Sequence, residues 1–247
     1  MRGLWALTWS EFKLALRDPM TVFWSLAFPT LWLVLMAGVI PGPIPGFSYQ
    51  AMNNGSLFLP AAISLVIVSA SFIGVPLELT TYRETAVLRR LRVTPVKTLT
   101  LVLAFSLSQF AFIIAGILVL LLVGYTVFDV RVLGSWAVFA GVTVYGMVLF
   151  LALGGAIGSV ARSFRAANII IWSSFMPMLM LSELFLPISV LPGWLQPVAK
   201  ALPLTPLNTL LRDIVYGVPL TDLWRLGVMA AWIVLAVVVI VRLFRWE

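Results

Sequence analysis

Long apolar runs separated by short polar connections dominate this chain. A helix needs about 20 apolar residues to cross a hydrocarbon layer about 30 Å thick. Six runs reach that length, at about 21–40, 57–77, 98–124, 135–158, 167–187 and 224–243. The pattern predicts an all-α integral membrane protein in which residues 1–247 form one transmembrane domain of six helices. Because six is even, both chain ends are expected on the same side of the membrane.

Prolines and glycines mark special places in these runs. Pro29, Pro60, Pro76 and Pro177 lie inside or at the edge of a run, where neighbouring groups in a membrane protein satisfy the carbonyls that a proline frees. We therefore expect kinks rather than gaps. The small residues of 154–158 give the fourth run a smooth face, which predicts close helix packing inside the protein.

The segment before the first run, residues 1–20, has a helical stripe of large apolar side chains. Its members recur at i, i+4, i+7 and i+11: Trp5, Trp9, Phe12 and Leu16. One apolar stripe beside cationic positions is typical of a helix lying in the membrane interface. Asp18-Pro19 predicts a break after it, because a residue before proline avoids the helical region. The alternative is a continuous extension of the first transmembrane helix.

The connection 188–223 carries helix signals of its own. Thr205 before Pro206 is typical of a helix start, and Gly217 predicts the end of that helix. A shorter apolar piece lies around 194–202. Both pieces are too short to cross a membrane, so we expect a re-entrant or surface-lying helical pair packed against the last two runs.

Composition agrees with a lipid environment. Hydrophobic residues make up 62% of the chain and charged residues only 10%, whereas a soluble protein carries about 25% charged residues. This excludes a soluble enzyme, a disordered scaffold and a nucleic-acid-binding module, despite the formal charge of +7. The absence of Cys and His excludes disulfides, thiolate nucleophiles, Ser-His dyads and the usual zinc sites. We predict no catalytic, cofactor-binding or metal-binding residues.

The cationic residues predict an orientation. Of the 16 Lys and Arg residues, 12 fall on the side of the chain ends and four on the opposite side: Arg131, Lys200, Arg212 and Arg225. Cationic connections are retained in the cytoplasm. Both termini and the connections 78–97 and 159–166 are therefore predicted to be cytoplasmic, in a multi-pass protein of a bacterial or archaeal cell membrane.

The connection 78–97 concentrates charge around a short apolar ridge. Val87, Leu88 and Leu91 form the ridge on one helical turn, among five of the cytoplasmic cations. A cytoplasmic helix with such a ridge can press into a groove on another protein. The alternative is a solvated charged face that only sets the topology.

Residues 82–95 carry a recognisable motif, Tyr-Arg-Glu-Thr-Ala-Val-Leu-Arg-Arg-Leu-Arg-Val-Thr-Pro. It resembles the cytoplasmic signature of the ATP-binding-cassette (ABC) type-2 exporter permeases, approximately Arg-Glu-x-Gly-Thr-Leu-x-x-Leu-Arg-x-Thr-Pro. The matching residues are Arg83, Glu84, Leu88, Leu91, Arg92, Thr94 and Pro95, while Ala86 and Val87 replace the Gly-Thr pair. The resemblance implies that this segment is the coupling helix, which transmits ATPase closure to the transmembrane helices.

A second match lies after the fifth run. Residues 184–197 and 202–212 are similar to the family's outward-side pattern of Phe-Pro, Pro-x-Trp-Leu and Leu-Pro-Leu-Thr before a short helix ending in Arg. Ser182-Glu183 stands where that pattern has Ser-Gly. The resemblance covers nearly the whole chain in span count and loop placement.

No ATP site is expected in this chain, because the phosphate-binding turn of ABC ATPases ends in Gly-Lys-Ser/Thr and the sequence has no Gly-Lys dipeptide. The resemblance implies a permease subunit, not an enzyme, with ATP and Mg²⁺ bound by separate ABC ATPase subunits. It also implies a dimer with a second copy or a paralogue. The expected passenger is amphipathic: a drug, a lipid-like molecule or a lipid-linked glycan.

Glu183 is an acidic residue near the outer end of the fifth run. An ionisable group at membrane depth is costly, which makes it a functional candidate, here at the exit of a translocation path. It could instead be the centre of an ion- or proton-coupled secondary carrier. The structural alternative is that it reaches water or pairs with Lys200 or Arg212. A membrane enzyme or anchoring subunit that works through the 188–223 helices is a further alternative.

Overall fold

The computed structural model describes residues 2–39, 54–85, 98–185 and 187–243. Over these residues the chain is helical and contains no strand. Six helical stretches are long and apolar enough to cross a membrane: Pro19–Val39, Asn54–Glu84, Phe105–Phe128, Trp136–Val160, Phe164–Leu181 and Leu223–Leu243. The predicted all-α membrane fold with six candidate spans is confirmed.

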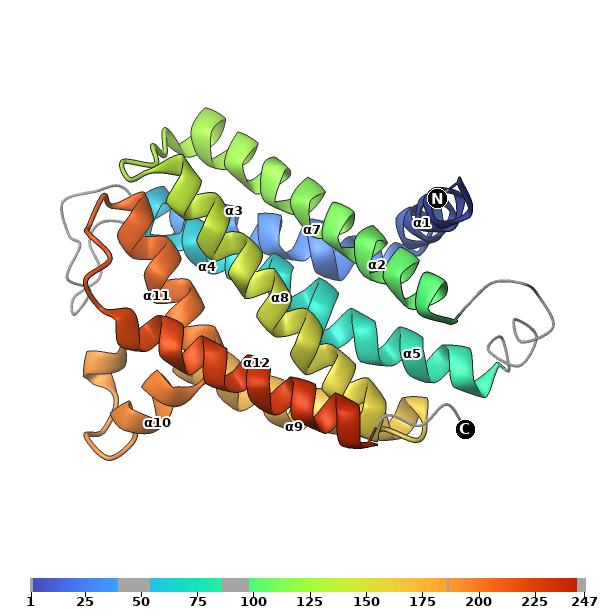
Figure 1. Cartoon of the computed structure of the whole chain (residues 1–247). Coiled ribbons are helices and arrows are strands. Elements are labelled where there is room, and N and C mark those ends of the chain that lie inside the picture. Colours follow the sequence, from blue (N-terminus) through green and yellow to red (C-terminus); the bar gives the residue numbers. More distant parts are fainter. Residues whose placement is uncertain (1, 40–53, 86–97, 186, 244–247) are drawn as a thin grey trace.

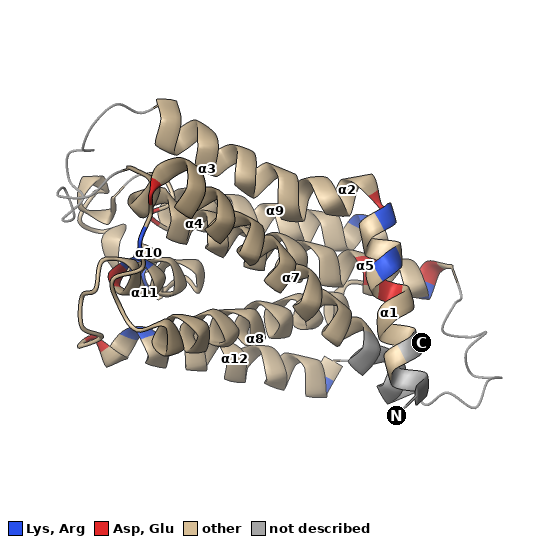
Figure 2. Ribbon diagram, turned by 90° about the horizontal axis from the view of Figure 1, so that it is seen from above, with Lys and Arg blue, Asp and Glu red and all other residues tan. Residues whose placement is uncertain are grey.

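The first helix, α1 (Arg2–Arg17), is separate from the first span. Asp18 caps the next helix, α2 (Pro19–Val22), by accepting hydrogen bonds from the backbone N–H groups of Met20 at 3.3 Å and Thr21 at 3.1 Å. The break predicted at Asp18-Pro19 is therefore present. Figures 1 and 2 show α1 running across the other helices at the end of the bundle where both termini lie. We call this the terminal end, and the opposite one the far end.

The second span lies at the centre of the bundle. It consists of α4 (Asn54–Val68), a π-helical segment η2 (Ser69–Gly74) and α5 (Val75–Glu84). α4 is buried along nearly its whole length, packed by α3 (Phe28–Val39), α7 (Thr98–Phe128), α8 (Trp136–Val160) and α11 (Leu204–Val215). The helix continues to Glu84, beyond the predicted end at 77, so the charged stretch begins on a helix.

Two π-helical segments precede prolines. η1 (Phe23–Ala27) joins α2 to α3 just before Pro29, and η2 lies just before Pro76. A proline cannot donate to the carbonyl four residues back, and those carbonyls, of Ser25 and Phe72, fall inside the two π segments. The wider π turn accommodates such an interruption. Two of the four proline positions thus coincide with a change of helix type.

The remaining spans pack around this centre. α7 lies against α1 and α4, while α8 contacts η2, α5 and α12 (Leu223–Leu243). α9 (Phe164–Leu181) lies against α5. Glycines allow the close approach of α8: a Cβ at Gly154 would lie 2.2 Å from the Ser71 carbonyl oxygen, and one at Gly158 would lie 2.8 Å from Leu79 Cδ1. The small-residue run therefore serves internal packing.

The 188–223 connection contains the expected helical pair, preceded by a 3₁₀ turn (Ile188–Val190). α10 (Gln196–Ala201) is short. α11 is buried mainly against α4 and α8, and it contacts the last two spans, α9 and α12, which were the predicted neighbours, less extensively. The predicted cap at Thr205 is wrong, because α11 begins at Leu204 with Pro203 in the cap position and no side-chain cap bond. Gly217, at φ +70°, ends the helix as predicted, since glycine favours that conformation.

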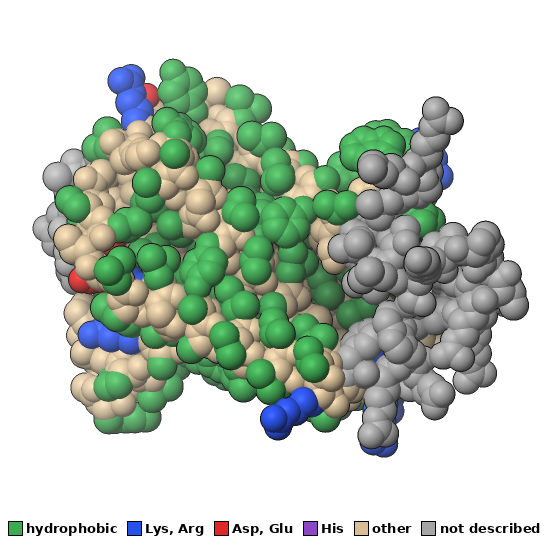
Figure 3. Space-filling view, in the orientation of Figure 1, with side chains coloured by type: hydrophobic (Ala, Val, Ile, Leu, Met, Phe, Trp, Pro, Cys, Tyr) green, Lys and Arg blue, Asp and Glu red, His purple; other side chains and the backbone are tan. Residues whose placement is uncertain are grey.

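Charged side chains of the described residues gather at the two ends of the bundle. Figure 2 shows the blue and red segments at the ends and a tan middle, and Figure 3 shows hydrophobic side chains over the middle of the visible face. The described members of the two predicted groups of cations thus lie at opposite ends. Which end faces the cytoplasm stays a prediction.

Candidate functional site

The candidate site lies at the terminal end, where α5 finishes beside the turn that joins α8 to α9. The first two signature residues, Arg83 and Glu84, occupy the last turn of α5. Figure 1 shows the end of α5, this turn and α1 at the same end of the molecule. Residues that are distant in sequence therefore meet where the signature segment begins.

Arg83 reaches the C-terminus of α8. Its Nη1 donates hydrogen bonds to the carbonyl oxygens of Gly158 at 2.6 Å and Ala161 at 3.0 Å. The last carbonyls of a helix lack partners within it and carry partial negative charge. The Arg83 guanidinium therefore binds two such oxygens and complements the helix dipole.

Glu84 reaches the N-terminus of α9. Its Oε1 accepts a hydrogen bond of 2.8 Å from the backbone N–H of Phe164, the first residue of that helix. Ser163 caps the same terminus by accepting from the Ala166 N–H at 3.2 Å. Because helix N-termini favour negative charge, the two adjacent residues Arg83 and Glu84 bracket the α8–α9 turn, each at the helix end that suits its charge.

Tyr82 joins α5 to α1. Its hydroxyl oxygen lies 2.7 Å from Glu11 Oε2 and 2.8 Å from Glu78 Oε1, and its ring meets Phe105 of α7 edge-on. Neither Tyr82 nor Glu11 was among the predicted site residues. The i, i+4 spacing of Glu78 and Tyr82 could have indicated their contact, but no sequence signal pointed to Glu11.

The rest of the predicted coupling segment lies outside the described residues. This concerns Val87, Leu88, Leu91, Arg92, Thr94 and Pro95. Their role in coupling stays a prediction. The described part of the segment ends at Thr85, whose exposed side chain follows the last turn of α5.

The predicted apolar stripe of α1 divides into two parts. Phe12 stacks on Trp9 and meets Phe112 of α7 edge-on, with ring centroids 6.1 Å apart. Trp5, Trp9 and Leu16 are exposed. One stripe member therefore fastens α1 to the bundle, while the others are free to face lipid headgroups, and the interfacial role of α1 stays a prediction.

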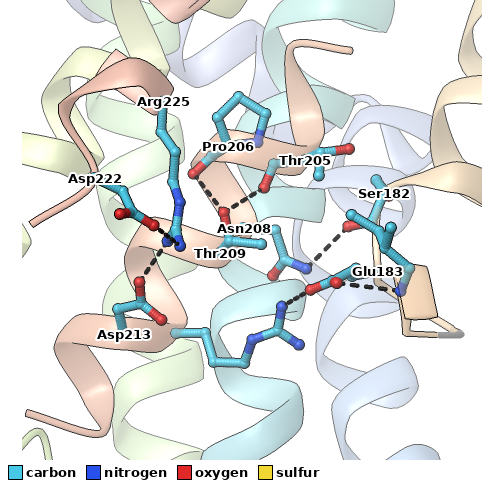
Figure 4. A network of polar contacts seen from close by, with 11 residues as sticks. Ser182, Glu183, Thr205, Pro206, Asn208, Thr209, Asp213, Asp222 and Arg225 are labelled. Carbon is cyan, nitrogen blue, oxygen red and sulfur yellow. Dashed lines mark hydrogen bonds and ion pairs between the residues drawn. The ribbon is translucent and has the colours of Figure 1, made fainter. Parts of the chain in front are cut away.

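Glu183 lies at the far end, just after α9, with a positive φ of 59°. Its carboxylate forms an ion pair with Arg212 of α11 and accepts a 3.1 Å hydrogen bond from the Ile188 N–H (Figure 4). The pairing with Arg212 was one of the structural alternatives, and it accounts for a largely buried carboxylate. A role for Glu183 in a translocation path stays a prediction.

A second ion pair stands beside the first. Asp213 of α11 binds Arg225 at the start of α12, and Arg225 also contacts Asp222 at 2.8 Å (Figure 4). Both partners of the Asp213–Arg225 pair are mostly buried. These contacts hold α11 to α12. Sequence reasoning missed them because it counted Arg225 only as a topology signal.

The polar contacts of Arg83, Glu84, Glu183 and Asp213 join one helix to another. Among the described residues, no three His, Cys, Asp or Glu side chains lie close enough to hold a metal ion. At the terminal end, Arg83 and Glu84 both bind backbone groups at helix ends. The arrangement suits the transmission of movement between helices.

Comparison with known proteins agrees with the signature. A search of curated proteins found no significant match. The sequence model of the ABC-2 type transporter family matches residues 2–216, from α1 through α11 and including the signature segment. This is most of the 247 residues. The chain therefore belongs to the ABC-2 type transporter family and is a membrane permease component of an ABC transporter.

Proposed function

We propose that this permease works with separate ABC ATPase subunits and with a second permease chain, a copy of itself or a paralogue, to export an amphipathic passenger. ATP and Mg²⁺ belong to the ATPase subunits. Family membership favours this function over an ion-coupled carrier or a membrane enzyme. In the proposal both chain termini face the cytoplasm of a bacterial or archaeal cell, which puts the terminal end within reach of the ATPases.

The observation that carries the proposal is the pair of contacts made by Arg83 and Glu84. ATPase closure would push on residues 84–95, and α5 is the helix that leads directly into this segment. Through Arg83 the movement would reach the end of α8, and through Glu84 the start of α9. Hydrogen bonds to charged groups contribute about 1.5–3 kcal/mol each. The part-buried Arg83 contacts fit this range, whereas water screens the exposed Glu84 contact and weakens it.

Variants of Leu88 and Leu91 test whether the predicted coupling segment contacts the ATPase and receives its movement. We expect Leu88→Asp and Leu91→Asp to abolish ATP-driven transport when the permease is purified and reconstituted with its ATPase, because a buried carboxylate would disrupt an apolar contact. ATPase binding to the permease should weaken in parallel. Wild-type ATP turnover and transport in both variants would refute the coupling role.

Variants of Arg83 and Glu84 test whether their contacts transmit the movement of α5 to α8 and α9. We expect Arg83→Gln and Glu84→Gln to retain ATPase binding but to lose most transport per ATP hydrolysed. Arg162→Gln is the matched control, because Arg162 is an exposed cation in the same turn. Equal transport per ATP in Arg83→Gln, Glu84→Gln and Arg162→Gln would contradict the proposed route.

A Glu183→Gln variant distinguishes an ATP-driven exporter from an ion- or proton-coupled carrier. An exporter driven by ATP does not need a titrating group at Glu183, whose carboxylate is already paired with Arg212. We expect Glu183→Gln, reconstituted with the ATPase, to keep ATP-driven export. Transport by the chain alone in liposomes under a proton gradient, lost in Glu183→Gln, would instead support the carrier.

A further inference from the structure

Glu11 of α1 and the α5 residues Tyr82 and Glu78 form two hydrogen-bond contacts, but with both carboxyls ionised only one proton is present to fill them. The Tyr82 hydroxyl oxygen lies 2.7 Å from Glu11 Oε2 and 2.8 Å from Glu78 Oε1, and both separations are hydrogen-bond distances. A tyrosine hydroxyl has one proton to donate, and an ionised carboxylate can only accept. With both carboxylates ionised, one of the two contacts would bring two oxygens together without a hydrogen between them.

One additional proton on a carboxyl group supplies the missing hydrogen. If one carboxyl is protonated, it donates to the Tyr82 oxygen, and the Tyr82 hydroxyl donates to the other carboxylate. Both contacts are then hydrogen bonds, and the negative charge of the group falls from two to one. Because the two carboxyls share one hydroxyl, the proton belongs to the group rather than to either residue.

The surroundings favour retention of this proton. Burial disfavours the charged form of Glu78, and its acidic neighbours Glu11 and Asp18 carry charge of the same sign when ionised. The described cations nearby are engaged or exposed: Lys13 lies over the Trp9 ring, Arg83 binds α8 carbonyls, and Arg17, Arg162 and Arg165 are exposed. Glu84, the remaining nearby acid, binds the Phe164 N–H.

The third element packed here adds no charge. The α7 face that meets this group carries Phe105, which contacts the Tyr82 ring, and Phe112, which contacts Phe12. Gln109 lies between them on the same helical face and is buried. No cation of α7 among its described side chains is therefore available to replace the proton.

We propose that Glu11, Tyr82 and Glu78 form a proton-dependent latch that fastens α1 to the terminal end of α5. At low pH the group holds its proton and both contacts are hydrogen bonds: the Tyr82–Glu78 bond lies within α5, and the Tyr82–Glu11 bond joins α5 to α1. As the pH rises and the proton leaves, one hydrogen bond is lost and two carboxylates repel each other across the contact. The latch acts on the helix that carries Arg83 and Glu84, yet the inference does not depend on the proposed coupling route.

Infrared spectroscopy tests for the proton directly. The full chain in lipid vesicles is titrated from about pH 5 to about pH 9 while the carboxylic-acid C=O stretch is recorded. We expect a titrating band in the wild-type protein that disappears in both Glu78→Gln and Glu11→Gln, because an amide can replace the protonated carboxyl as donor. Asp129→Asn is the control, since Asp129 is an exposed acid at the far end. No difference between the three variants would overturn the proposal.

Spin labels test the latch. The chain has no Cys, so Ser10→Cys and Thr81→Cys give two unique labelling sites on exposed side chains of α1 and α5. We expect the label separation to be narrow at low pH and to lengthen and broaden at high pH. Glu78→Gln should remain narrow throughout, and Tyr82→Phe should be broad at every pH. A separation that does not change with pH in the wild type would overturn the latch even if the proton is found.

Discussion

The close approach of α8 to η2 at Gly154 predicts that three glycine-to-alanine variants of α8 differ in stability. A Cβ at Gly154 would lie 2.2 Å from the Ser71 carbonyl oxygen and 3.2 Å from Val75 Cβ. The first distance is 1.2 Å short of the 3.4 Å at which ordinary contact begins. Because the obstacle is backbone of η2, no rotamer change relieves it, and α8 must move away from the central span.

The expected cost follows from this displacement. Overpacking a close-packed interior by a methyl group costs about 1–3 kcal/mol, and a chain of this length loses about 2–4 °C of Tm for each kcal/mol. We therefore expect Gly154→Ala to lower the Tm by roughly 5 °C. Thermal unfolding of the purified protein, followed by the fluorescence of its 10 Trp residues, measures the shift.

Two other glycines of α8 provide matched controls. A Cβ at Gly141 would meet nothing within 4 Å, and one at Gly155 would lie 3.3 Å from Ile240 Cδ1, the tip of a flexible side chain. In a helix, alanine is favoured over glycine by about 0.5–1 kcal/mol. Gly141→Ala should therefore be neutral or stabilising and Gly155→Ala nearly neutral. If Gly154→Ala proved as stable as Gly141→Ala, the close packing of α8 on η2 would be refuted.

Further predictions concern the far end. Glu183→Gly should be more stable than Glu183→Ala by about 1–2 kcal/mol, because both remove the ion pair but only glycine relieves the positive φ; equal Tm values would contradict this. Arg225→Gln should destabilise the protein by about 3–5 kcal/mol, since it breaks a mostly buried pair with Asp213. Arg131→Gln should cost about 0–1 kcal/mol, because both partners of the Arg131–Asp129 pair are more than 70% exposed. Equal effects of Arg225→Gln and Arg131→Gln in thermal unfolding would refute the ranking.

The sequence predicted those features of the fold that depend on local pattern. Apolar runs gave the six candidate spans, and Asp18-Pro19 gave the break after α1. The end of the second span was misplaced at 77 because charge begins at Glu78, whereas the helix continues to Glu84. Within this extension the Thr80 and Thr81 hydroxyls donate to the carbonyls of Pro76 and Leu77, so these polar side chains are satisfied inside the helix.

Contacts to distant backbone groups could not be predicted. The motif singled out Arg83 and Glu84, but their partners at Gly158, Ala161 and Phe164 are backbone atoms. Every residue has such atoms, so the sequence carries no sign of which ones are used.

Glu183 shows a mixed outcome. Its pairing with Arg212 was foreseen as an alternative, but its left-handed backbone was not. The positive φ at Glu183 gives a physical reason for the glycine that the family pattern has at this position, because glycine adopts this conformation at no steric cost.

The central claim is that the terminal end, where α5 leads into the signature segment, faces the cytoplasm and the ATPases. Thr85 is exposed at the end of α5, and Lys200 is exposed in α10 at the far end. In a chain without other Cys, Thr85→Cys and Lys200→Cys can each be labelled with a membrane-impermeant maleimide, on intact cells and on inverted vesicles. We predict that Thr85→Cys is labelled only in inverted vesicles and Lys200→Cys only on intact cells. Labelling of Thr85→Cys on intact cells would contradict the account.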